Sequence, residues 1–300
     1  MLDYPDDRAA ARYAGLVGVD DVKSRVHNQL ALWLAPERLA EWSHRYGHQG
    51  LVSELAAPPS RAPVIVLAGD SGTGKTSLAE SLGDPLARSL RVKLRAYRVG
   101  PNPGSVRRLE AALRLDSASQ AVTVETTTAV SGHILIYDPQ YALETGGTGD
   151  PQGGPDRRGV VDRVVLAAEM LAAHGQPAAV ILCVSQPSEV DVAVRRLTSE
   201  AFVLARPGAA EREVVLRRLT EGIRMTDAEL VRLVRATGPR DGAPGYTYGD
   251  LTQRLMHAAI MASYPDRPLT ATTLIGVARR LSPTPAAEAV SSEGTQPPTD

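Results

Sequence analysis

The chain has 300 residues, enough for about two domains, and its 33 basic and 34 acidic residues give a formal net charge of −1. This balance argues against a protein that binds nucleic acid by charge alone. The single cysteine, Cys183, excludes an internal disulfide framework, and no histidine or cysteine spacing indicates a structural metal. Without a run long enough to span a bilayer or a signal-peptide pattern, we expect a soluble, cytoplasmic protein with no membrane partner.

The N-terminal part contains one turn signal and one helix signal. Residues 1–12 are polar and acidic at the start, which predicts an irregular, flexible arm. Two glycines within 13–19 suit a turn, and Asp20 or Asp21 can cap the helix that follows. Residues 45–63 contain several glycines and prolines and predict a loop.

Residues 69–76, with the sequence Gly-Asp-Ser-Gly-Thr-Gly-Lys-Thr, match the P-loop pattern between the apolar run 64–68 and a helical pattern. Such glycines let consecutive backbone N–H groups turn toward one anion at a helix N-terminus. Lys75 is expected to reach the β- and γ-phosphates of a nucleotide, and the Thr76 hydroxyl to bind Mg²⁺. The candidate nucleotide-binding residues here are Asp70, Ser71, Gly72, Thr73, Gly74, Lys75, Thr76 and Ser77.

Positive charge is concentrated after the P-loop helix. Residues 91–99 alternate as a half-buried strand does, and seven basic residues lie between Asp84 and Glu110 without an acid among them. The pattern favours a solvated edge strand guarded by positive charge. A surface that docks an acidic partner or nucleic acid is the alternative.

A second motif is the apolar strand 133–137, which ends in Asp138. A carboxylate at the end of such a strand is typical of a Walker B element, which holds Mg²⁺ beside the P-loop. A buried strand that ends in aspartate by chance is the alternative. The predicted metal ligands are therefore Thr76 and Asp138.

The second half of the sheet follows from apolar runs. A loop dense in glycine and proline at 144–159 leads to a predicted helix at 160–173. The continuous apolar run 178–184 suits a strand in the middle of a parallel sheet. Residues 202–205 predict the last strand, and Arg-Pro-Gly at 206–208 marks a domain boundary.

From residue 209 onward the pattern is helical, with a capping sequence at 226–229 and a final amphipathic helix at 270–281. We therefore predict an α/β fold, a parallel αβα P-loop sandwich followed by a small all-helical lid. The predicted divisions are an arm at 1–12, a nucleotide-binding domain at 13–207, a lid at 208–282 and a disordered tail at 283–300.

Three motifs in order resemble the AAA family of AAA+ ATPases: Leu-Val-Gly-Val-Asp-Asp-Val-Lys at 16–23, the P-loop with its Walker B strand, and Gly-Tyr-Thr-Tyr-Gly-Asp-Leu at 245–251. The resemblance implies ATP in a cleft between sandwich and lid, with Val17 and Gly18 near the adenine. It also implies a homo-oligomeric ring, usually a hexamer, that remodels a protein client or assembly partner.

The resemblance assigns further roles. Gln186 follows the strand at the sensor-1 position, which contacts the γ-phosphate or the attacking water. Arg195 and Arg196 lie where the family carries an arginine finger that reaches the neighbouring subunit's site, although a solvated helix end would look the same. The candidate catalytic residues are thus Lys75, Asp138, Gln186, Arg195 and Arg196.

Two departures from the family pattern bear on activity. Pro139 stands where hydrolysing members carry a glutamate that orients or deprotonates water, a role worth about 10²- to 10⁴-fold in rate. The central-pore loop would lie within 100–105, which lacks the aromatic residue that grips a threaded polypeptide. We therefore expect ATP binding with slow hydrolysis, unless Glu125 or Glu144 substitutes. An ATP-driven remodeller, a nucleotide-gated pseudo-ATPase subunit and, less favoured, a P-loop kinase stay open.

Overall fold

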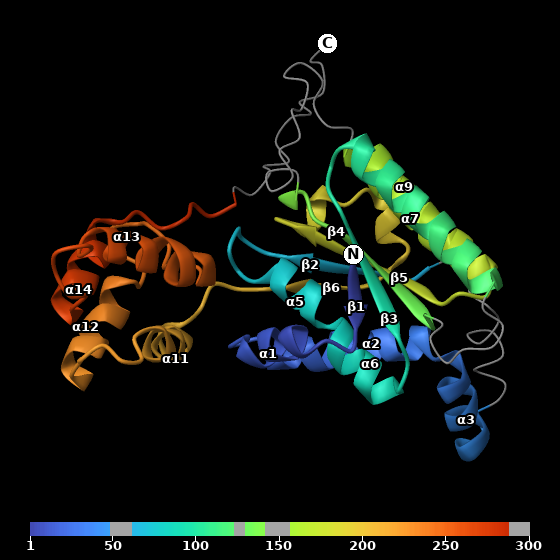
Figure 1. The fold of residues 1–300 in the computed structure, drawn as a ribbon, viewed down its shortest axis with the longest axis horizontal. Coiled ribbons are helices and arrows are strands. Elements are labelled where there is room, and N and C mark those ends of the chain that lie inside the picture. The colour runs from blue at the N-terminus through green and yellow to red at the C-terminus, as the bar shows by residue number, and fades with distance from the viewer. Residues whose placement is uncertain (49–61, 123–129, 142–156, 288–300) are drawn as a thin grey trace, which may run out of the picture.

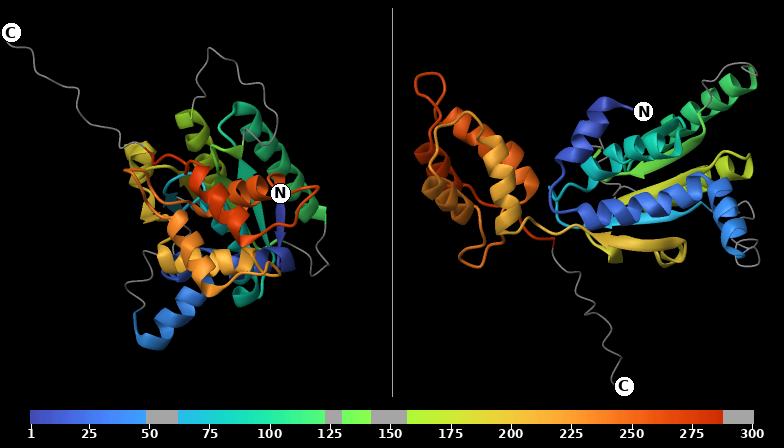
Figure 2. Two further views of the ribbon diagram at one scale, coloured as in Figure 1. Left: turned by 90° about the vertical axis from the view of Figure 1, so that its left-hand side faces the viewer. Right: turned by 90° about the horizontal axis from the view of Figure 1, so that it is seen from below.

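The structure, a computed structural model, describes residues 1–48, 62–122, 130–141 and 157–287. Two bodies lie side by side (Figure 1): a sheet with helices on both faces, and a group of helices from the last part of the chain. Figure 2 shows the helical body beside one end of the sheet, reached by the segment between the last strand and α11. No helix in the described ranges has both the length and the apolar character that a bilayer crossing needs.

One six-stranded sheet occurs in the described residues, with the strand order β1-β3-β4-β5-β2-β6. All neighbours pair in parallel except β1 and β3. The parallel strands are β2 (Val64–Ala68), β3 (Leu94–Val99), β4 (Gly132–Tyr137), β5 (Ala178–Val184) and β6 (Thr198–Val203). Strands β2, β4 and β5 are buried along their whole length, as expected of strands covered on both faces. The predicted α/β sandwich is confirmed.

The two faces of the sheet bury alternate residues of each strand. Ile65 and Leu67 pack with helices on one face, whereas Val64 and Val66 pack with helices on the other. The first face is covered by α1 (Asp7–Gly15), α2 (Asp20–Leu34), α5 (Lys75–Ser81) and α6 (Gly83–Leu90). The second is covered by α7 (Pro103–Val122) and α9 (Arg157–Ala173). The other elements of this part of the chain are α3 (Pro36–Tyr46), the 3-10 turn η1 (Pro187–Glu189) and the short helix α10 (Val192–Arg195).

Residues 1–12, for which the sequence predicted an irregular arm, instead form strand β1 (Leu2–Tyr4) and the first part of α1. Strand β1 adds to β3 in antiparallel orientation. The buried Tyr4 hydroxyl donates to the carbonyl oxygen of Glu80. A three-residue strand is too short to show alternation in the sequence, and this long-range pairing holds it in place.

The expectation that β3 is an edge strand is wrong, because β1 and β4 flank it. Its burial also exceeds the predicted half, since Tyr97 and Val99 are buried on the second face. The positive charge of this region is compensated by carboxylates. Arg95 of β3 pairs with Asp3 of β1, and Arg88 of α6 pairs with Asp7 of α1 and with Asp84, four residues earlier in α6.

The C-terminal helices pack around a cluster of their own, which includes Leu216, Leu233, Leu255 and Leu274. They are α11 (Ala209–Leu219), α12 (Asp227–Ala236), the π-helical turn η2 (Asp250–Leu255), α13 (Met256–Met261) and α14 (Ala271–Arg280). We call this body the lid. Thr226 caps α12 as predicted, in a capping box with Glu229.

Two predicted segments, the C-terminal tail and the loop 144–159, are described only in part. Residues 283–287, predicted to be disordered, run back from α14 toward the P-loop and make the hydrogen bonds described below. Residues 288–300, Glu125, Glu144 and most of the loop 144–159 lie outside the described residues.

Candidate functional site

The P-loop connects β2 to α5, and its glycines are required by close approach. Gly69 and Gly72 have φ values of 141° and 81°. A Cβ at Gly69 would lie 2.3 Å from the Leu204 carbonyl oxygen, and one at Gly72 would lie 2.5 Å from Thr247 Oγ1 in the lid. Because a side chain fits at neither position, the loop can pack tightly between the sheet and the lid.

Lys75, at the start of α5, is folded onto the loop that precedes it. Its Nζ donates to the carbonyl oxygens of Gly69, at 2.7 Å, and Asp70, at 2.9 Å. Only 8% of the residue is exposed, and burial lowers the pKa of the ammonium group. The group is thus held at the mouth of the loop by carbonyl oxygens, which are weaker acceptors than phosphate oxygens.

The two predicted metal ligands, 62 residues apart, are in direct contact. Thr76 Oγ1 donates to Asp138 Oδ2 at 2.8 Å, and Asp138 is 2% exposed at the end of β4. The other carboxylate oxygen accepts the backbone N–H of Gln140 at 2.9 Å. A hydroxyl and a carboxylate are hard oxygen donors, so the pair fits Mg²⁺.

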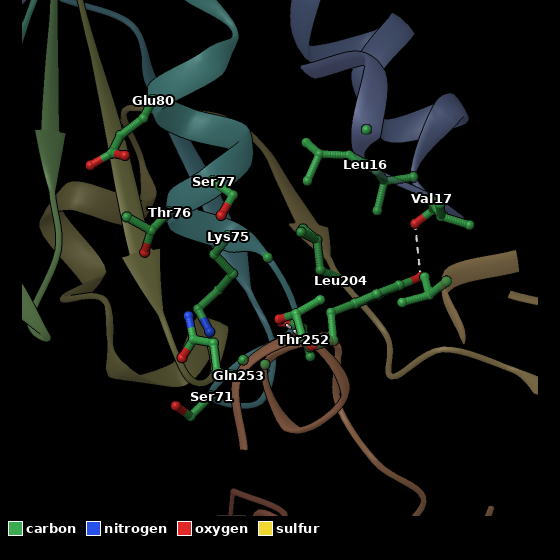
Figure 3. A pocket seen from close by; sticks show the side chains of 18 of the residues that line it. Leu16, Val17, Ser71, Lys75, Thr76, Ser77, Glu80, Leu204, Thr252 and Gln253 are labelled. Carbon is green, nitrogen blue, oxygen red and sulfur yellow. Dashed lines mark hydrogen bonds between the residues drawn. The ribbon is translucent and has the colours of Figure 1, made fainter. Parts of the chain in front are cut away.

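These groups line one end of a cavity of about 490 Å³ between the sheet and the lid (Figure 3), a size typical of small-molecule sites. Its polar end contains Ser71, Gly72, Thr73, Gly74, Lys75, Thr76, Ser77, Glu80, Arg98, Asp138 and Gln140. The rest of its lining contains the apolar residues Leu16, Val17, Val19, Leu204, Val215 and Leu219, together with Gly15, Arg218, Tyr248, Gly249, Thr252 and Gln253. We call the part with the apolar residues the apolar end. The cavity therefore offers an anion site and an apolar site side by side.

Known proteins share this architecture along nearly the whole chain, although no family model matches it. CD-NTase-associated protein 6 of Escherichia coli strain MS 115-1 is 31% identical over 294 residues, 95% of this chain and 94% of that protein. The chain belongs to the AAA family and, within it, to the CD-NTase-associated protein 6 family.

Solved structures agree with that assignment. A chain of the E. coli MS115-1 HORMA:CdnC:Trip13 complex is 29% identical over 96% of both chains, with a TM-score of 0.74. The FIGL-1 AAA domain in complex with ADP is 18% identical over 95% of this chain and 93% of that one, with a TM-score of 0.56. The second likeness shows the AAA fold alone.

The AAA segment 16–23 closes the apolar end of the cavity. Val17 lines it, and the Val17 carbonyl oxygen accepts the hydroxyl of the half-buried Tyr248 of the lid at 2.8 Å. Partial burial raises the pKa of Tyr248 to about 12. Gly18 is not part of the lining. The ammonium group of the buried Lys23 donates to the Leu16 carbonyl oxygen at 2.8 Å and so holds the two ends of the segment together.

Besides Gly18, four predicted site residues do not line the cavity: Asp70, Gln186, Arg195 and Arg196. Arg195 and Arg196 are exposed at the end of α10. Gln186 Nε2 donates to the carbonyl oxygen of Ala287 at 3.4 Å. Asp70 Oδ1 accepts the Ala287 N–H at 2.7 Å, away from the cavity.

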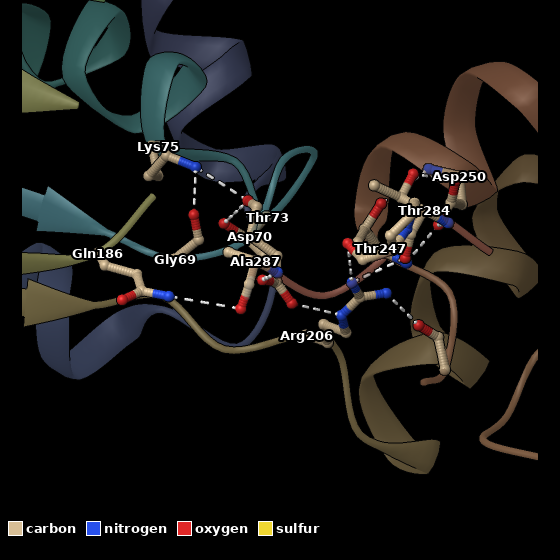
Figure 4. Close-up of polar contacts among 12 residues, drawn as sticks. Gly69, Asp70, Thr73, Lys75, Gln186, Arg206, Thr247, Asp250, Thr284 and Ala287 are labelled. Carbon is tan, nitrogen blue, oxygen red and sulfur yellow. Dashed lines mark hydrogen bonds and ion pairs between the residues drawn. The ribbon is translucent and has the colours of Figure 1, made fainter. Parts of the chain in front are cut away.

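Asp70 also contacts Arg206, a residue that the sequence marked only as part of a domain boundary (Figure 4). Arg206 Nε donates to Asp70 Oδ2 at 2.6 Å, and its other nitrogens donate to the carbonyl oxygens of Gly245 and Thr284. Burial acts to raise the pKa of Asp70, but the bonds from Ala287 and Arg206 lower it overall. Thr284 in turn bonds both carboxylate oxygens of Asp250 in the lid. One arginine thus joins the P-loop, the lid and the segment 282–287.

At the polar end of the cavity, three lining residues were not predicted from the sequence: Glu80, Arg98 and Gln140. The Glu80 carboxylate accepts from Arg12 at 2.7 Å and from Arg98, whose guanidinium lies 4.1 Å from the centre of the Tyr141 ring. Gln140 Nε2 donates to Ser71 Oγ at 2.9 Å. Helical spacing from Thr76 could have suggested Glu80, and the position after Pro139 could have suggested Gln140.

Proposed function

We propose that this AAA protein binds ATP with Mg²⁺ in the cavity and hydrolyses it slowly. The observation that carries the proposal is the convergence of Lys75 with the Thr76–Asp138 pair at the polar end of one cavity. Thr76 and Asp138 would hold Mg²⁺, which neutralises phosphate charge. The loop amides and Lys75 bind the phosphates, and the apolar end, with Val17 and Tyr248, takes the base.

Slow hydrolysis is proposed because Pro139 can neither orient nor deprotonate water. Binding does not depend on that position, since the loop, Lys75 and the metal pair are independent of it. Glu80 lines the cavity, but its two carboxylate oxygens already accept hydrogen bonds from Arg12 and Arg98.

We further propose that ATP turnover remodels a protein partner that contains a HORMA domain. The support is the 31% identity to CD-NTase-associated protein 6 and the likeness to a chain of a complex that contains HORMA and CdnC. A cytoplasmic homo-oligomeric ring is part of this proposal. Arg195 and Arg196 are exposed and lie outside their own chain's cavity, as a finger that serves a neighbouring subunit would.

A nucleotide-gated assembly subunit that does not turn over ATP is the second candidate. Pro139 and the lack of an aromatic residue within 100–105 favour it. The two candidates differ in hydrolysis and not in binding.

Phosphate release and light scattering separate them. Phosphate release is measured for the wild type and Lys75→Ala, with and without HORMA and CdnC proteins, and particle mass is measured in ATP. A remodeller gives slow turnover, below ~1 s⁻¹, that depends on Lys75 and changes with the partner, together with an ATP-dependent change in the partner complex. Binding and assembly without Lys75-dependent turnover would support the second candidate instead.

A further inference from the structure

The residue after the Walker B aspartate does not face the nucleotide cavity. Pro139 lines a different, smaller cavity, together with Tyr137, Val184 and Glu189. Gln140, one residue later, lines the nucleotide cavity beside Lys75 and Asp138. The turn after β4 thus presents residue 140, and not residue 139, to the phosphate end.

Two hydrogen bonds hold Gln140 in this place. Its backbone N–H donates to Asp138 Oδ1 at 2.9 Å, while Asp138 Oδ2 accepts from Thr76 at 2.8 Å. Its side-chain Nε2 donates to Ser71 Oγ at 2.9 Å, on the P-loop. The backbone of Gln140 is therefore held by Asp138 and its side-chain nitrogen by the P-loop, and the residue lines the same cavity as Lys75.

The carboxylates of the cavity are already engaged. Among the described lining residues they are Glu80 and Asp138. Glu80 is paired with two arginines, and Asp138 accepts from Thr76 and from the Gln140 backbone. Glu189 lines the other cavity and accepts the N–H of Gln186. Each of the three carboxylates thus already accepts hydrogen bonds from other groups of the chain.

We infer that Gln140 orients the water that attacks the γ-phosphate, an inference that rests on the proposed ATPase function. The water oxygen bonds to the γ-phosphorus as the bond from that phosphorus to the β–γ bridging oxygen breaks. With Nε2 donating to Ser71, the Gln140 carboxamide oxygen accepts one water hydrogen and aims the oxygen lone pair. A carboxamide cannot take the proton, which passes to a phosphate oxygen, so turnover is slow but not absent. Other P-loop enzymes use a glutamine in this way.

The test compares Gln140→Leu and Gln140→Glu with Gln29→Leu, a matched change outside the cavity in a residue that donates to Glu200 on β6. For each variant, kcat for phosphate release and Kd for a non-hydrolysable ATP analogue are measured. Gln140→Leu should lower kcat about 10-fold or more and leave Kd within about 2-fold. Gln140→Glu should keep or raise kcat, and Gln29→Leu should match the wild type.

A Gln140→Leu kcat within about 2-fold of the wild type, with turnover still lost in Lys75→Ala, would overturn the inference and leave the proposed function standing. So would a large gain in kcat from Pro139→Glu with none from Gln140→Glu, since that would place residue 139 at the phosphate. If the wild type released no phosphate, or if Lys75→Ala released it as fast as the wild type, both the proposed function and this inference would be wrong. A loss of affinity for the ATP analogue in Gln140→Leu, with kcat unchanged, would assign Gln140 to binding alone and would also contradict the inference.

Discussion

The core wall and the lid wall of the cavity are built in different ways. The core wall comes from two short motifs that follow β2 and β4, the strands on either side of β5 in one buried sheet, and its key contact joins Thr76 to Asp138. The lid wall meets it through a few polar contacts, such as Tyr248 with Val17 and Gly249 with Gly72. Rigid packing fixes the chemistry on one side, and the other side can reposition when a few hydrogen bonds change.

The largest effect is expected from Lys75→Ala, which removes a charged donor from the core wall. Loss of charge-assisted hydrogen bonds, about 1.5–3 kcal/mol each, should weaken ATP affinity about 100-fold. Fluorescent-nucleotide titration measures it, and Lys93→Ala, at an exposed lysine before β3, is the matched control. Unchanged ATP affinity in Lys75→Ala would show that the phosphates do not bind at the core wall.

Next comes Arg206→Gln, which breaks the junction between the two walls. Arg206 is 13% exposed at its side chain and bonds Asp70, Gly245 and Thr284. We expect a loss of about 2 kcal/mol in the free energy of unfolding and faster proteolysis of the segment 282–287. The control is Arg217→Gln, which loses an exposed pair with Glu213 and should change stability little. Equal Tm values for both variants would show that the junction does not hold the lid.

A smaller effect is expected from Asp138→Asn, which changes the metal side of the core wall. The Mg²⁺-dependent gain in ATP affinity should fall about 10-fold, as for other groups that support a metal through hydrogen bonds. Affinity is compared in Mg²⁺ and in EDTA. If the variant keeps the full response to Mg²⁺, the metal is held elsewhere.

The smallest effect is expected from Tyr248→Phe, which removes one hydroxyl between the lid and Val17. Loss of one neutral hydrogen bond is worth about 1 kcal/mol, so ATP affinity should fall about 5-fold with little change in kcat. Calorimetric titration measures the affinity. If Tyr248→Phe lowered ATP affinity as much as Lys75→Ala does, the lid wall would contribute to binding as strongly as the core wall, contrary to the comparison.

The same contrast explains what the sequence could predict. Strand β2 with the loop and helix α5 after it, strand β4 and the Thr226 cap depend on residues close together in the chain, and local patterns predicted these elements. Strand β1, the Arg95–Asp3 and Arg88–Asp7 pairs, and the Arg206 junction join residues far apart, so no local pattern signals them. The direction of Pro139 could not be predicted either, because the turn after β4 decides which of two consecutive residues faces the cavity.

Photoaffinity labelling with 8-azido-ATP and Mg²⁺, followed by peptide mapping, tests most directly whether one cavity joins the two walls. We expect the label on peptides that contain Val17 or Tyr248. Excess ATP should suppress this labelling, and Lys75→Ala should abolish it. Label that ATP suppresses on peptides away from both residues, or no such label at all, would contradict this account.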